Sequence, residues 1–155
     1  MSRTQRMQVV QRVTTDHEQR QARNYTASRE KVSQCETRLV ELQNYHDEYQ
    51  RGLAGRMTTG MDATGLRDYQ AFLAKLADAV RQQSQTLSQA RAECENQKLL
   101  WQHAAQRTKI IDQLVVQRQA EDQRAVHSRE QRDADERALR APRAPIGLIP
   151  GESRP

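Results

Sequence analysis

The chain has 155 residues, of which only 35% are hydrophobic and 4% aromatic, and its mean hydropathy is −1.00. This composition excludes a thick globular core, because too little apolar material is present to build one. Gln, Arg, Ala and Glu dominate, while Gly and Pro are scarce before the C-terminus. These good helix formers favour long helices in a thin coiled coil over disorder.

The formal net charge of +5 is concentrated at the N-terminus. Residues 1–31 contain seven Arg/Lys against three Asp/Glu, whereas residues 116–140 contain six of each. We interpret the excess as a solvated helix face, since no aromatic residues are interleaved for stacking on nucleic-acid bases. No run of about 18 apolar residues exists, and the N-terminus has no continuous apolar segment of a signal peptide. A cytoplasmic protein is predicted.

The first predicted helix covers residues 4–54. Stepping back from Leu53 by alternating fours and threes gives a largely apolar seam, as in a coiled coil. Its positions are Leu53, Tyr49, His46, Leu42, Leu39, Cys35 and Val32, followed by the weaker Ser28, Tyr25 and Gln21. Nearer the N-terminus, Met7, Val10 and Val13 indicate a shifted register.

A loop is predicted over residues 55–64, where the composition changes. Residues 52–65 hold four of the six glycines of the chain. Gly52 or Gly55 is expected to end the first helix, because glycine favours helix C-termini. Asp62 or Thr64 is the expected N-cap of the next helix, because a short side-chain oxygen can accept from its first unpaired N–H groups. The chain is therefore predicted to turn back on itself as a hairpin.

The second predicted helix covers residues 65–140 and has the stronger heptad pattern. Its seam positions are Leu66, Tyr69, Leu73, Leu76, Val80, Gln83, Leu87, Ala90, Cys94, Gln97, Trp101, Ala104, Thr108, Ile111 and Val115. Folding about the loop pairs Val32 with Leu87 and Leu39 with Val80. The same register places Cys35 near Gln83 and away from the second cysteine, Cys94, so no internal disulfide is expected.

This pairing exhausts the first helix near residue 115, which leaves residues 116–140 as an overhang without an intramolecular partner. Such a segment is marginal as an isolated helix and is expected to fray until a partner covers it. Residues 141–155 contain all four prolines and are predicted to form a flexible tail. The sequence thus predicts an all-α fold: a long antiparallel two-helix coiled-coil hairpin, residues 1–140, with an overhanging second helix and a disordered C-terminal tail.

One flank of the predicted hairpin is apolar near the loop. Heptad positions g of both helices lie on the same side of an antiparallel pair. This register places Tyr45, Phe72 and Ala79 on that side, while the opposite e side is mostly polar. The rings either widen the core at the tip or form a docking surface. A two-helix rod cannot bury both rings completely, so we favour docking.

Catalysis is not expected, and neither a cofactor nor a metal site is predicted. Both cysteines lie at seam positions, where a free thiol behaves as a small hydrophobe, and they lack metal-ligand spacing. The histidines are isolated on helices that leave no concave pocket. These are His17, His46, His103 and His127.

Three segments carry a resemblance to a known family: "LVELQNYHDEYQRGL" before the loop, "LRDYQAFLAKLADAVRQQ" after it, and "QKLLWQHAAQRTKIIDQL" further on. Together they resemble the flagellar export protein FliJ family over residues 3–138, most clearly over 39–115. The resemblance implies a long antiparallel coiled coil similar to the central stalk of rotary ATPases. It also implies a role in flagellar type III export, in which the protein associates with the export ATPase ring, docks on the cytoplasmic domain of the membrane export gate, and escorts emptied export chaperones.

The same resemblance implies two sets of contact residues. Docking on the export gate is assigned to Leu42, Tyr45, Tyr49, Phe72, Leu76, Ala79 and Gln83. Arg38 stands where the family pattern suggests an uncharged polar residue. By analogy with rotary stalks the paired termini enter the ATPase ring, with contacts from Arg3, Arg6, Arg12, Lys109 and Arg118. The implied location is the cytoplasmic face of the inner membrane at the flagellar basal body, reached only through partners, and no nucleic acid is expected.

Two alternatives remain open. The chain could be the equivalent stalk protein of a virulence-type secretion system, which only genomic neighbourhood would separate from the flagellar one. In a different class, it could be a basic coiled-coil protein that binds nucleic acid. That function predicts retention on DNA with a steep loss of affinity as salt rises.

Overall fold

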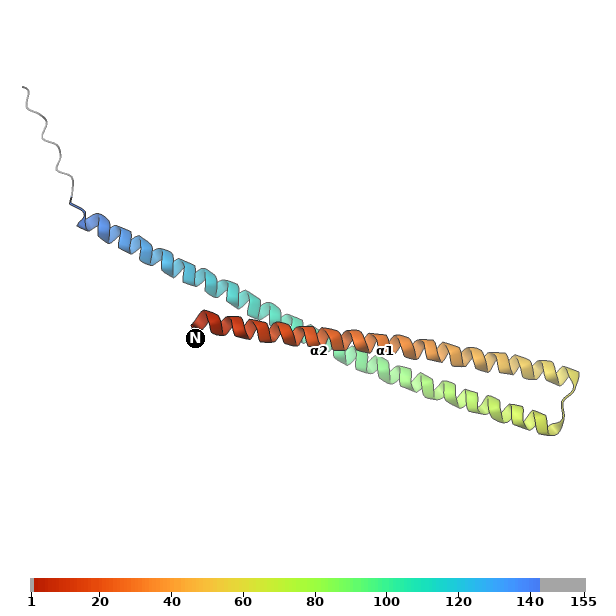
Figure 1. The fold of residues 1–155 in the computed structure, drawn as a ribbon. Coiled ribbons are helices and arrows are strands. Elements are labelled where there is room, and N and C mark those ends of the chain that lie inside the picture. The colour runs from red at the N-terminus through yellow and green to blue at the C-terminus, as the bar shows by residue number, and fades with distance from the viewer. Residues whose placement is uncertain (1, 143–155) are drawn as a thin grey trace, which may run out of the picture.

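The protein folds as a hairpin of two long helices. The structure is a computed structural model and describes residues 2–142. Helix α1 spans Arg3–Thr59, helix α2 spans Ala63–Arg140, and residues 60–62 join them. The helices run antiparallel and cross each other, and α2 continues well past the start of α1 (Figure 1). The predicted all-α hairpin with an overhanging second helix is confirmed. Most of the predicted tail, residues 143–155, lies outside the described residues.

The turn is shorter than predicted, because α1 passes through both glycines that were expected to end it. The helix stops instead at Gly60, whose φ of 96° lies in a region that other residues rarely adopt. At the other side of the turn the predicted N-cap Asp62 is confirmed, since its Oδ1 accepts a hydrogen bond from the Gly65 N–H at 2.9 Å. A glycine inside a helix costs only about 1 kcal/mol relative to alanine, which the packing of a 57-residue helix can offset.

Gly52 has a packing role instead. A Cβ atom at this position would lie 2.5 Å from the hydroxyl oxygen of Tyr69 on α2. Only a glycine lets the tyrosine hydroxyl approach the α1 backbone this closely, because any side chain would occupy the same space. The predicted role of Gly52 as a helix end is therefore wrong.

The seam in the middle of the hairpin follows the predicted register. Every predicted α2 seam position is buried or half-buried. Cys35, Leu87 and Ala90 form a buried cluster against which Val32 and Leu39 pack. Gln83 lies beside this cluster and donates from Nε2 to the carbonyl of Cys35 at 3.2 Å. Both cysteines are free thiols, in agreement with their predicted separation.

Trp101 anchors the seam from α2. Its ring stacks on Tyr25 of α1, with centroids 5.8 Å apart and the planes 4° from parallel. The guanidinium of Arg29 lies 5.7 Å from the centroid of the same tyrosine ring, within reach of a cation–π attraction. Aromatic packing thus continues the seam into the weaker part of α1.

The predicted register shift near the N-terminus does not occur. Val10 and Val13 are 47% and 58% exposed, and the unbroken heptad register places Gln11 and Thr14 in the seam instead. Gln11 donates from Nε2 to Asp112 Oδ1 at 2.8 Å, and the hydroxyl of Thr108 lies 3.3 Å from the carbonyl oxygen of Thr14. Partly buried polar groups are tolerated where they find hydrogen-bond partners, so this seam is held by polar contacts across the helices.

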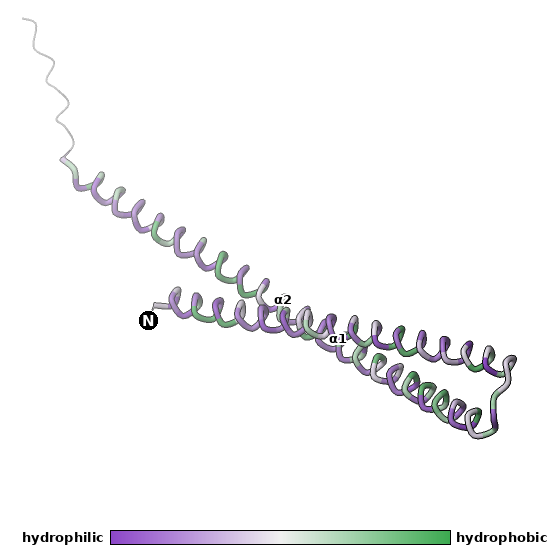
Figure 2. The backbone as a smooth tube through the Cα atoms, turned by 45° about the vertical axis from the view of Figure 1, so that its right-hand side comes forward, coloured by the Kyte–Doolittle hydropathy of each residue, from purple (hydrophilic) through white to green (hydrophobic). Residues whose placement is uncertain are grey.

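The two helices remain in contact somewhat beyond residue 115. Val115 is buried, Arg118 is half-buried, and the hydroxyl of Thr4 lies 3.4 Å from Asp122 Oδ2. From residue 121 to residue 142 every side chain is exposed. The overhang therefore begins at residue 123, later than predicted, because the first turn of α1 still lies against α2. Figure 2 shows the overhang coloured mostly as hydrophilic, with few apolar residues.

Candidate docking surface at the tip of the hairpin

Three aromatic rings from the two helices meet next to the turn. Tyr49 of α1 packs against the edge of Phe72 of α2, with ring centroids 4.7 Å apart and planes at 64°. Its ring is also tilted toward Tyr69, at a centroid distance of 5.9 Å. Edge-to-face pairs of this kind are worth about 0.5–1.5 kcal/mol beyond the area they bury. The rings therefore hold one another in place across the seam.

Tyr69 forms the inner end of this aromatic cluster. It is half-buried, its hydroxyl lies against Gly52, and the guanidinium of Arg56 lies 5.5 Å from its ring centroid. One feature of the sequence does indicate the role of Gly52: the predicted hairpin pairing places this glycine almost opposite Tyr69. A glycine facing a ring across a coiled-coil seam indicates close approach rather than a helix end.

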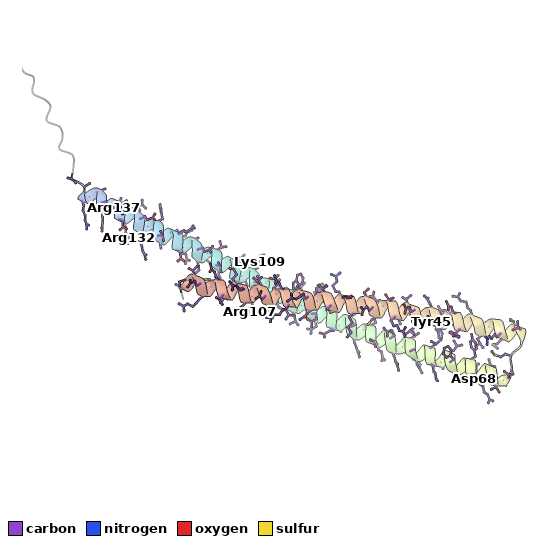
Figure 3. The ribbon with its side chains drawn as sticks, viewed as in Figure 1. Tyr45, Asp68, Arg107, Lys109, Arg132 and Arg137 are labelled. Atoms are coloured by element: carbon purple, nitrogen blue, oxygen red, sulfur yellow. The ribbon has the colours of Figure 1, made fainter. Side chains whose placement is uncertain are left out.

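The outer rings remain accessible to solvent. Tyr45 is 52% exposed, Tyr49 39% and Phe72 42%. Tyr45, labelled in Figure 3, lies one turn before Tyr49 on α1. Tyr49 occupies a seam position of the heptad and yet is more exposed than the seam residues further along the rod, and its ring lies against Phe72.

The other residues assigned to gate docking are less exposed than the three outer rings. Leu42, Leu76 and Ala79 are half-buried and line the seam or its edge. Gln83 is also half-buried, and its side-chain amide is engaged with the Cys35 carbonyl. We call this whole set the tip patch; it comprises Leu42, Tyr45, Tyr49, Phe72, Leu76, Ala79 and Gln83. Its accessible part consists of the three outer rings.

Charge at the border of the tip patch is partly neutralised. Arg38, one heptad before Tyr45, is exposed and forms an ion pair with Glu41 at 3.6 Å.

The opposite flank of the hairpin is more polar. It holds a groove of about 440 Å³ lined by polar side chains together with Ala77 and Val80. The two flanks of the tip thus differ in polarity.

The residues assigned to the ATPase ring lie at the open end of the hairpin. Arg3, Arg6, Arg12 and Lys109 are exposed, and Arg118 is half-buried. Figure 3 shows Arg107 and Lys109 on α2 beside the N-terminal part of α1. This end is strongly basic: residues 2–31 contain seven Arg/Lys and three Asp/Glu, and residues 98–120 contain four and one. Basic side chains from both helices are therefore gathered far from the tip.

Within residues 2–142 no group of three or more His, Cys, Asp or Glu side chains is arranged to hold a metal ion. Over the same residues, neither helix contains a stretch that is long and apolar enough to cross a bilayer.

The fold defines a two-stranded antiparallel coiled-coil protein that exposes an aromatic patch at one end and basic side chains at the other. A family model described as flagellar FliJ protein matches residues 2–145. The chain therefore belongs to the FliJ family and is a coiled-coil protein related to flagellar type III export. Comparisons with curated proteins and with solved structures found no match.

Proposed function

We propose that the protein is the coiled-coil stalk of the flagellar export ATPase complex, that it docks on the export gate through the tip patch, and that it escorts emptied export chaperones. It acts by binding rather than by catalysis, without a cofactor, in the cytoplasm and at the inner membrane only through its partners. The observation that carries the proposal is the family match over residues 2–145 on a hairpin whose tip exposes a cluster of aromatic rings.

Gate docking is supported by the state of the outer rings. Tyr and Phe are enriched in the cores of protein interfaces, where they supply large apolar contacts. Tyr49 and Phe72 are fixed against each other at 4.7 Å, so little side-chain freedom is lost when a partner covers them. Tyr45 offers a half-exposed ring beside them. A preformed aromatic surface of this kind suits a protein partner.

The stalk role is supported by the separation of the two ends. Helix α1 has 57 residues and is roughly 85 Å long at about 1.5 Å per residue, so Tyr45 lies roughly 50–63 Å from Arg12 and Arg3. One molecule can therefore contact the ATPase ring through its termini and the gate through its tip at the same time. Chaperone escort completes the proposal, and the uncovered helix of residues 123–140 is an accessible surface for it.

The proposal is tested by measuring the affinity of the full chain for the purified export ATPase and for the purified cytoplasmic domain of the gate. Both partners are expected to bind. Replacing Arg3, Arg6 and Arg12 together by Glu should weaken the ATPase complex at least tenfold and leave gate binding unchanged. A reversed charge changes affinity only at an interface where it faces charges of the partner. A chain that binds neither purified partner would refute the proposal. Tighter binding to the gate domain of a virulence-type system would favour that system instead.

A nucleic-acid function remains a second candidate because of the excess of Arg and Lys at the open end. It predicts binding to duplex DNA that weakens steeply as salt rises, since released counterions drive such binding. The same triple charge reversal would then abolish DNA binding. Absence of DNA binding at low salt, together with binding of the two export partners, would eliminate this candidate.

A further inference from the structure

The exposed valines of α1 belong to a continuous face that the coiled coil does not use. Val10 and Val13 lie in a row whose members are separated alternately by three and four residues and so point to the same side of the helix. All members are exposed. The row consists of Arg3, Arg6, Val10, Val13, His17 and Arg20. Basic residues thus stand at both ends of an apolar centre.

This face and α2 together form a groove of about 470 Å³, which we call the valine groove. On the α1 side it is lined by Val10 and Val13, and on the α2 side by Ile111 and Arg107. Ala104, only 4% exposed, forms its floor. Leu114 and Ile110 of α2, 43% and 51% exposed, add further apolar surface in the same part of the helix.

The rim of the valine groove is basic. Arg20 and Arg107 both line it, together with His17, whereas no acidic residue does. The one acidic residue of α2 between positions 98 and 120 is Asp112, which accepts a hydrogen bond from Gln11 and lines a different groove. Neither arginine forms an ion pair within residues 2–142, although Asp16 lines the adjoining groove together with Val13 and Arg20.

We propose that the valine groove binds an acidic amphipathic helix of a partner protein. The lining runs from Val9 to Arg20, which corresponds to roughly three helical turns or 16 Å. A helix with apolar side chains at every third or fourth position would cover the valines, as in other helix-in-groove complexes. Carboxylates beside that apolar row would pair with Arg20 and Arg107.

Other occupants fit less well. A second copy of this chain would bring another strongly basic open end against the first, and the like charges would repel. A nucleic acid would contact the arginines but would leave the valines uncovered, because its backbone offers phosphates rather than apolar side chains. The inference does not depend on the proposed export function, since no residue assigned to gate docking or to the ATPase ring lines the groove. Arg3 and Arg6 of the second set stand in the same row as the valines but outside the lining.

The test uses the full chain and two fluorescent peptides of about 16 residues, long enough to span the groove as a helix. Both carry Leu at helical spacing; one has Glu and the other has Lys at the flanking positions. Binding is measured by anisotropy. The apolar variant is Val10→Asn with Val13→Asn, matched by Val40→Asn with Val126→Asn, which changes two valines that are equally exposed elsewhere. The charge variant is Arg20→Glu with Arg107→Glu, matched by Arg67→Glu with Arg132→Glu, both exposed.

We expect the native chain to bind the Glu peptide and not the Lys peptide. The apolar variant should bind the Glu peptide roughly tenfold more weakly or worse, as when anchors at an interface are removed. The charge variant should lose the Glu peptide and gain the Lys peptide, while both matched controls should bind as the native chain does. Circular dichroism of each variant should show unchanged helix content, so that altered binding is not a folding defect.

Four results would overturn the inference. The two peptides could bind the native chain equally well, or the apolar variant could retain full affinity for the Glu peptide. Sedimentation could reveal a dimer that the apolar variant dissociates, which would make a second copy the occupant. Finally, duplex DNA could bind and be released by the charge variant while the Glu peptide fails to bind, which would assign the basic rim to nucleic acid.

Discussion

Replacing Tyr45 and Phe72 together by Ala should separate docking from folding. A fully buried Phe→Ala change costs about 3–5 kcal/mol of unfolding free energy. Because Phe72 is 42% exposed and Tyr45 52% exposed, about half of that applies at each position, or roughly 3–5 kcal/mol in total. For a chain of this length each kcal/mol lowers the melting temperature by about 2–4 °C, so a decrease of roughly 6–20 °C is expected.

The effect on gate binding should be much larger. Aromatic anchors at an interface contribute about 2 kcal/mol or more each. Losing two of them corresponds to roughly a thousandfold increase in Kd for the gate domain. Affinity for the ATPase should be unchanged, because its proposed contacts lie at the open end, 33 to 46 residues along the helices or roughly 50–70 Å away. Both affinities and the melting curve are measured on the same double variant, well below its melting temperature.

The matched control is Val40→Ala with Leu99→Ala. These side chains are 54% and 48% exposed, so apolar side chains of similar exposed fraction are truncated outside the tip patch. Gate affinity should stay at the native value in this control. If the Tyr45/Phe72 variant melts early but still binds the gate with native affinity, the rings belong to the core and the docking proposal is wrong.

Four further predictions concern stability, each measured by thermal or urea unfolding followed by circular dichroism. Replacing Leu87, 6% exposed, by Ala should lower the free energy of unfolding by about 2–5 kcal/mol, whereas the same change at Leu99, 48% exposed, should lower it by about half as much; equal losses would contradict the seam. Gly60→Ala should cost about 1–3 kcal/mol because its φ of 96° strains a side chain. Gly55→Ala, where a Cβ meets nothing within 4 Å, should instead stabilise by about 0.5–1 kcal/mol. Removing residues 123–155 should lower the melting temperature by no more than about 2 °C, the effect of less than 1 kcal/mol; a loss like that of Leu87→Ala would show that the overhang packs on the rod.

The seam was predictable because its signal is local. The heptad spacing from Leu66 to Val115 can be counted along the sequence as long as α2 is one continuous helix. Every one of these seam positions is buried or half-buried in the structure. Pairing across the turn then followed from counting, and it placed Gln83 beside Cys35 correctly. The apolar flank at the tip was likewise predicted from the heptad register, and the exposure of Tyr45 and Phe72 agrees with it.

Near the start of α1, the polarity of the residues did not predict which of them are buried. At the N-terminus the apolar residues Val10 and Val13 were expected inside, but Gln11 and Thr14 occupy the seam. Their inclusion depends on Asp112 and Thr108, which supply hydrogen-bond partners from the other helix. No property of α1 by itself reveals those partners.

The sequence by itself determined the helices, their antiparallel pairing and the side on which the aromatic residues gather, since all three depend on residue spacing within a continuous helix. Only the tertiary structure decided that α1 runs through Gly52 and Gly55, that its contact with α2 reaches Asp122, and that the valines near its start border a groove. The physical reason is that each of these features depends on atoms from both helices: the Tyr69 hydroxyl that requires Gly52, the side chain that Thr4 meets, and the α2 wall that faces Val10 and Val13.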